Sequence, residues 1–141
     1  MISPQQISFL LARLAVGMSM FGHGLVRLPK LHTFSNGMVS QFEKSILPGF
    51  IVTPFSYILP IAELLTGIFL LIGLFTKQAL IAGTIIMIAL IFGSSMIEEW
   101  GSIPSQLIHA AFFTILLTFE KSYNSFAVDS ILERNRKAGF Q

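Results

Sequence analysis

The chain has 141 residues, of which 53% are hydrophobic and only 11% are charged, and its mean hydropathy is +0.75. A soluble domain of this size carries about 25% charged residues, because water must wet its surface. Seven acidic and nine basic side chains are too few for such a surface, which excludes a cytosolic enzyme and a disordered chain. The net charge of +2 is too small to indicate nucleic acid as a partner. The composition indicates an integral membrane protein.

Four apolar stretches follow one another, each near the roughly 20 residues that a helix needs to cross a bilayer. The predicted spans are residues 7–26, 55–75, 79–96 and 103–119. They must be helices, because lipid offers the backbone no hydrogen-bond partners. We therefore expect an all-α, polytopic membrane protein: one domain over residues 1–141, built as a four-transmembrane-helix bundle with a C-terminal cytoplasmic tail over residues 120–141.

The connection between the first two predicted spans has an apolar pattern of its own. Apolar residues recur there at three- and four-residue steps, namely Leu31, Phe34, Met38, Phe42 and Ile46. The other side of that helical period holds polar residues, namely His32, Ser35, Asn36, Gln41, Glu43 and Lys44. The pattern favours a short helix lying in the membrane interface, and an irregular capping loop is the alternative.

The lysine and arginine residues predict the orientation of the chain. With four spans, both termini and the turn between the second and third spans share one side. That side carries five basic residues: Lys77, Lys121, Arg134, Arg136 and Lys137. The other side carries three: Arg27, Lys30 and Lys44. The excess predicts that both termini lie in the cytoplasm. We expect the protein to be a multi-pass protein of the bacterial inner membrane.

Four ionisable residues fall inside the predicted spans: Arg13, His23, Glu63 and His109. A charge at this depth costs at least about 2.5 kcal/mol, so each such residue is a functional hypothesis. Helix rise places Arg13 and Glu63 roughly 9 Å apart along the membrane normal, a gap that an arginine side chain can largely close. We expect the two to exchange protons with a ligand or to form an ion pair. The alternatives are that Arg13 reaches the headgroups or that the pair only fixes helix packing.

Helix rise also places His23 and His109 in the same outer half of the bilayer as Glu63. There they could bind the polar head of a ligand or line a proton path. Axial haem ligation is a weaker hypothesis, and a hydrogen bond to a neighbouring helix is the commoner role of such histidines. The sequence has no cysteine and no pattern of metal ligands, so neither an iron–sulfur cluster nor a metal site is expected.

Several short segments carry a family resemblance. They are Arg13, Gly22-His23-Gly24, Lys30, residues 59–67, residues 71–77 and residues 125–129. With these segments the sequence resembles the DoxX family of small four-helix membrane proteins, which includes a subunit of thiosulfate:quinone oxidoreductase. The resemblance implies a four-helix bundle with a link to sulfur oxidation or redox defence and quinone as the electron acceptor. It also implies that Arg13 and Glu63 are important positions.

The leading hypothesis is a quinone-linked redox subunit of the membrane. Glu63, His23 and His109 would surround the quinone head, and Arg13 would hold Glu63 ionised. Without cysteine, electrons must come from a soluble redox partner or a small reductant, and the chain either works alone or as a homo-oligomer in the lipid bilayer. The alternative is a non-enzymatic membrane protein, either a carrier of a small solute or a structural subunit of a larger complex.

Overall fold

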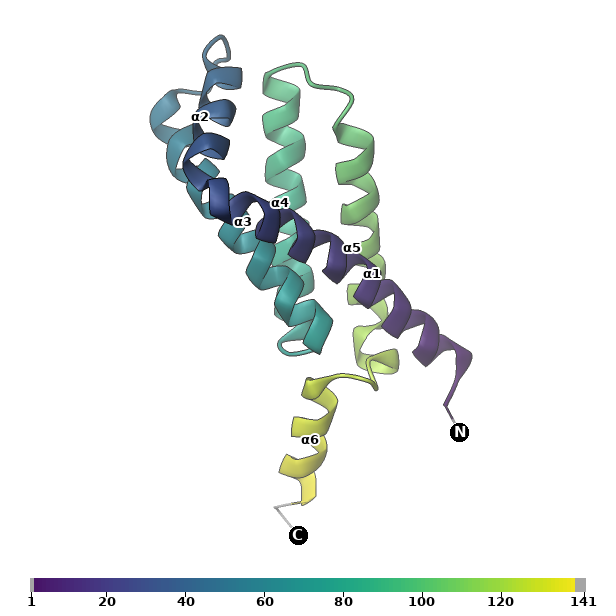
Figure 1. Ribbon diagram of the computed structural model, residues 1–141. Coiled ribbons are helices and arrows are strands. Elements are labelled where there is room, and N and C mark those ends of the chain that lie inside the picture. The colour runs from purple at the N-terminus through teal and green to yellow at the C-terminus, as the bar shows by residue number, and fades with distance from the viewer. Residues whose placement is uncertain (1, 139–141) are drawn as a thin grey trace.

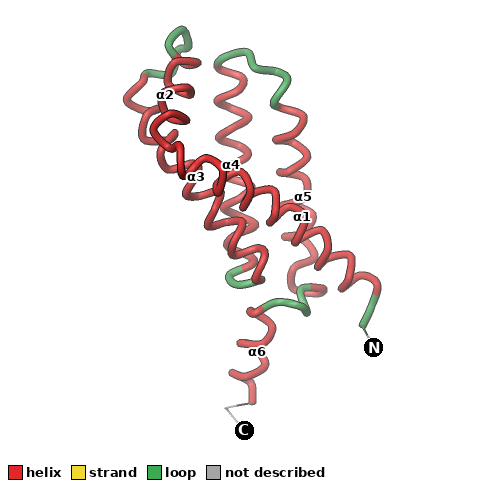
Figure 2. The backbone as a smooth tube through the Cα atoms, in the orientation of Figure 1, coloured by secondary structure: helices red, strands yellow, loops and turns green. Residues whose placement is uncertain are grey.

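The computed structural model describes residues 2–138, and in that range the chain is helical with no strand. The elements in chain order are α1 (Pro4–Arg27), the 3-10 turn η1 (Leu28–Lys30), α2 (Leu31–Phe42), α3 (Gly49–Ile72), α4 (Thr76–Met96), α5 (Ile103–Tyr123) and α6 (Val128–Ala138) (Figures 1 and 2). Four stretches of helix are long and apolar enough to cross a membrane. The prediction of an all-α, four-span architecture is confirmed.

The two ends of the bundle carry different features. Both ends of the chain lie at one end of the bundle, together with the α3–α4 turn and α6 (Figure 1); we call this the terminal end. The opposite end carries α2 and the loop between α4 and α5, and we call it the α2 end. Helix α3 begins six residues earlier than the predicted span and α5 ends four residues later, so both reach further than hydropathy indicates.

The predicted connecting helix exists as α2, and η1 joins it to α1 without a break. It packs against the first turns of α3, where the hydroxyls of Ser35 and Ser56 lie 2.6 Å apart and both residues are buried. Ser56 donates its proton to the carbonyl of Thr53 at 2.6 Å, so Ser35 is the donor between the two hydroxyls. Ser35, which the sequence pattern assigns to the polar side of this helix, is therefore buried against α3. A hydroxyl can pack here because it finds a partner.

Two glycines allow α1 and α3 to touch backbone to backbone. A Cβ atom on Gly24 would lie 2.5 Å from the amide nitrogen of Leu64 and 2.6 Å from the carbonyl oxygen of Pro60. A Cβ on Gly67 would clash with the backbone of Phe21 in the same way. Small residues permit such close helix approach in membranes, where packing rather than hydrophobic burial drives association. The contact places the C-terminal end of α1 beside the middle of α3.

Helices α4 and α5 form the other wall of the bundle and run side by side (Figure 1). The ring of Phe113 from α5 is fully buried against Gly83 of α4, which has no side chain to obstruct it. A core of buried apolar side chains joins this wall to α1 and α3: Phe9, Val16, Met20, Leu70, Ala79, Leu80, Met87, Phe113 and Leu116. This core occupies the terminal end and the middle of the bundle and leaves the α2 end less filled.

The Gly22-His23-Gly24 segment provides a matched test of the α1–α3 contact. Gly24→Ala should lower the unfolding free energy by about 1–3 kcal/mol, because the added methyl group overpacks a backbone contact. Gly22→Ala should have little effect, since no atom lies within 4 Å of a Cβ there. Thermal unfolding in one detergent compares the two variants. Equal destabilisation by both would contradict the close approach at Gly24.

Candidate functional site

Glu63 forms an ion pair with Arg27. A single guanidinium nitrogen of Arg27, Nη1, donates to Oε1 of Glu63 at 2.7 Å and to Oε2 at 2.5 Å. The Glu63 side chain is only 3% exposed. The expected pairing of Glu63 with Arg13 is wrong. The sequence pattern assigns Arg27 to the loop after the first span, but the contact at Gly24 and the early start of α3 bring Arg27 level with Glu63.

Arg27 is also held by α2. Its guanidinium carbon lies 4.9 Å from the centre of the Phe34 ring, a cation–π contact. The arginine thus ties α1 to both α2 and α3. Glu63 occupies one of its nitrogens, and the arginine remains 26% exposed at this position. The other N–H groups of the Arg27 guanidinium are therefore available to donate to a ligand.

His109 of α5 is hydrogen-bonded through both ring nitrogens. Nδ1 lies 2.8 Å from the carbonyl oxygen of Ser105, and Nε2 lies 2.8 Å from the hydroxyl of Ser19 on α1. Because a carbonyl only accepts, Nδ1 carries a proton and donates to Ser105, and the Ser19 hydroxyl, which can donate or accept, is the partner of Nε2. These two bonds fix the orientation of the imidazole and join α5 to α1.

The structure brings His23 and His109 together, a contact that their similar predicted depths allow. The ring centres are 6.5 Å apart and the rings are nearly perpendicular, at 81°. Ser19, His23 and Arg27 follow one another at four-residue steps and so form one row along α1. That spacing was visible in the sequence and could have identified Ser19 and Arg27 as members of the site.

A cavity of about 350 Å³ opens beside this row, at the α2 end. Its polar lining includes Arg27, Glu63, His23, His109 and Gln106. Its apolar lining comes from the surrounding helices and consists of Met20, Phe34, Met38, Leu59, Met87 and Leu90. Gln106 donates from its side-chain nitrogen to Ser94 at 2.9 Å, while its buried oxygen has no hydrogen-bond partner. The cavity therefore combines apolar walls with a few polar groups, one of them an unused acceptor, which is the usual make-up of a small-ligand site.

Arg13 lies at the terminal end, away from this cavity. Its Nη1 donates to Oδ1 of Asn124 at 3.0 Å, and its Nη2 donates to the carbonyl oxygen of Phe126 at 2.7 Å. The residue is only 1% exposed. Arg13 therefore neither reaches headgroups nor touches Glu63. It holds the segment after α5 against the bundle.

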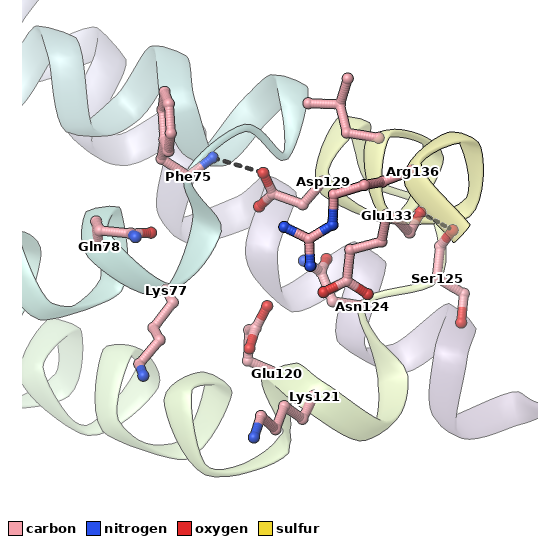
Figure 3. A pocket seen from close by; sticks show the side chains of 12 residues that line it. Phe75, Lys77, Gln78, Glu120, Lys121, Asn124, Ser125, Asp129, Glu133 and Arg136 are labelled. Carbon is pink, nitrogen blue, oxygen red and sulfur yellow. Dashed lines mark hydrogen bonds between the residues drawn. The ribbon is translucent and has the colours of Figure 1, made fainter. Parts of the chain in front are cut away.

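Asp129 completes the same junction from the other direction. Its carboxylate accepts from the amide nitrogen of Phe75 at 2.8 Å (Figure 3) and from that of Thr76 at 2.7 Å. Its own amide donates to the carbonyl of Gly73 at 3.0 Å. The carboxylate caps the N-terminus of α4 from 53 residues away in the chain. Gly73 has a positive φ of 69°, and a side chain there would clash with Arg13. Residues 124–129 of the predicted tail are thus held against the bundle, while α6 projects away from it (Figure 1). The last three residues of the tail lie outside the described part of the chain.

A second cavity, of about 600 Å³, lies between the start of α4, the end of α5 and α6 (Figure 3). Its charged lining mixes both signs: Lys77, Glu120, Lys121, Asp129, Glu133 and Arg136. Of these, Asp129 already serves as a cap. The surface has the character of a hydrated helix junction, so the cavity at the α2 end is the better candidate. Within residues 2–138 no group of three histidine, cysteine, aspartate or glutamate side chains could hold a metal ion.

The comparisons with known proteins agree with this architecture. The family model DoxX matches residues 8–95, more than half of the chain. The chain is a multi-pass membrane protein that belongs to the DoxX family, which confirms the resemblance inferred from its segments. Neither the comparison with curated proteins nor that with solved structures finds a match. Within the matched residues, residues 22–24 and Glu63 lie near the cavity, and Arg13 and residues 71–77 lie at the terminal junction.

Arg13→Gln should weaken the terminal junction without affecting the cavity. Loss of the guanidinium removes two hydrogen bonds from a charged donor, to Asn124 and to the carbonyl of Phe126, at a cost of about 1–3 kcal/mol. Limited proteolysis should then cut the segment after Tyr123 faster than in the wild type. Arg134→Gln, which removes an exposed charge of α6, is the matched control and should leave cleavage unchanged. Equal protection of Asn124–Asp129 in both variants would contradict the role assigned to Arg13.

Proposed function

We propose that the chain is a quinone-linked redox subunit that binds the quinone head in the cavity beside Arg27 and Glu63. The observation that carries the proposal is the combination, in one cavity, of apolar walls with a paired carboxylate, two histidines and the unpartnered oxygen of Gln106. A quinone head is a flat apolar ring with two polar oxygens, so it needs that combination. The volume of about 350 Å³ suits a single ring.

The residues of the cavity have distinct parts in this proposal. Arg27 donates from its free N–H groups to one carbonyl oxygen, while its ion pair keeps Glu63 ionised in an apolar setting. The oxygen of Gln106 accepts a hydrogen bond from the reduced head, which carries hydroxyls in place of carbonyls. Phe34 and Met38 cover the ring from α2. A bound quinone would supply the acceptor of two electrons and two protons that the side chains lack.

His109 is the group best arranged to move a proton within the cavity. Its ring keeps one nitrogen bound to the Ser105 carbonyl and directs the other to the Ser19 hydroxyl. A proton taken up at Nε2 is then shared with Ser19, whose hydroxyl turns to accept, and the ring does not have to move. Electrons come from a soluble redox partner or a small reductant, because the chain has no cysteine.

We also propose an inner-membrane location with both termini in the cytoplasm. The basic residues supply the support. With Arg27 occupied by Glu63, the loop charges outside the bundle are five on the terminal side and two, Lys30 and Lys44, on the other. The asymmetry is larger than a plain count gives. The quinone cavity then opens in the outer leaflet.

A pair of variants separates binding from a purely structural ion pair. Glu63→Gln leaves Arg27 uncompensated and should cost about 3–5 kcal/mol of stability, since breaking a buried pair strands a charge. The double variant Arg27→Met with Glu63→Leu removes both charges and should fold about as well as the wild type. Purified wild-type protein should retain quinone near one per chain on solvent extraction, and the folded double variant should retain none.

Glu43→Gln, which neutralises an exposed carboxylate after α2, is the matched control and should retain quinone as the wild type does. If the double variant folds and still retains quinone, the ion pair has only a structural role. If the wild type retains no quinone, the redox proposal fails, and a carrier or a structural subunit of a membrane complex becomes the better account of the cavity.

A further inference from the structure

A shallow groove of about 450 Å³ runs along the face of α1 next to the cavity. Its lining consists of Met18, Ser19, Gly22, His23, Val26 and Arg27. The groove exists because Gly22 has no side chain between the bulkier residues one turn before and after it. No atom lies within 4 Å of where a Cβ would stand, so the neighbouring helices leave this strip of α1 uncovered.

Two residues, His23 and Arg27, line both the groove and the cavity. They form one edge along α1, with the cavity on one side and the groove on the other. His23 is exposed and Arg27 is partly so, so the edge is not closed over by α5. Below it, the hydrogen bond of Ser19 to His109 joins α1 to α5. The cavity and the groove therefore adjoin above that bond, along His23 and Arg27.

The groove faces the surrounding bilayer. Met18 is 57% exposed and Val26 is 60% exposed, and both are apolar, as side chains in contact with lipid must be. From Met18 to Val26 the helix rises about 12 Å, which is long enough to hold the first part of a hydrocarbon chain. A chain lying there could continue into the bilayer without meeting another helix.

We propose that the groove at Gly22 receives the hydrocarbon tail of the ligand whose head occupies the cavity, so that the substrate is a long-tailed, lipid-borne quinone that enters sideways between α1 and α5. This inference rests on the proposed function and narrows its substrate class. A head buried beside Glu63 needs an exit for its tail, and the groove adjoins the cavity along His23 and Arg27, at a strip of helix where Gly22 has no side chain. An ordinary lipid acyl chain is the competing occupant of the groove.

Quinones with and without an isoprenoid tail test the inference on the full chain in lipid nanodiscs. Both are titrated against wild-type protein and against Gly22→Phe, which fills the groove. Comparing the two proteins with the same quinone cancels the partition of that quinone into lipid. Gly22→Phe should weaken binding of the long-tailed quinone at least about tenfold, or about 1.4 kcal/mol, and leave the tailless quinone within about twofold, or about 0.4 kcal/mol.

Two further variants keep the result decisive. Gly37→Phe adds the same ring on α2, where the space is also open and does not line the cavity, and it should bind both quinones as the wild type does. Val26→Trp fills the groove one turn further on, should Gly22→Phe not fold. Unchanged binding of the long-tailed quinone in the groove variants would assign the groove to lipid and overturn the inference. Equal loss of both quinones in a folded variant would overturn it too, while no binding of either by the wild type would instead defeat the proposed function.

Discussion

The ion pair of Arg27 with Glu63 is the interaction on which the α2 end of the bundle depends. A buried carboxylate in the middle of α3 needs a cation beside it. Arg27 is that cation, and it reaches Glu63 because the last residue of α1 lies level with the middle of α3. The backbone contact at Gly24 makes that possible. Once α1 ends there, η1 and α2 must cover the remaining turns of α3, which is where Ser35 meets Ser56. The cavity is the space left between α2 and the wall formed by α4 and α5.

The chain uses two arginines of α1, Arg13 and Arg27, for opposite purposes. Arg27 neutralises a carboxylate and faces a cavity. Arg13 bonds to an amide oxygen and a backbone carbonyl and faces none of the described cavities. Asp129 caps α4 at the same place. Together these contacts hold the segment after α5 against α1 and the start of α4. The DoxX segments at the terminal junction are thus explained by folding, and those near the cavity remain available to bind a ligand.

Hydropathy and helical period were enough to predict the four spans and the connecting helix, because lipid leaves the backbone no alternative to helix. The depth argument also placed His23 and His109 correctly at one level. The depth argument could not predict which side chains pair with one another. Arg13 and Glu63 looked closer than they are because depth along the normal says nothing about which helices touch, and a glycine contact decided that. Arg27 was missed as a loop residue, although its place in the row with Ser19 and His23 was visible in the sequence.

The central claim, that a quinone head lies between α1, α2 and α5 beside the ion pair, is tested most directly by photoaffinity labelling. An azido-quinone is irradiated with the full-length protein in nanodiscs, and the labelled peptides are located by mass spectrometry. The account predicts labels on residues 20–42 and 102–109 that excess unmodified quinone removes. Labels spread over the lipid-facing sides of α4 and α5, undiminished by competitor, would contradict it.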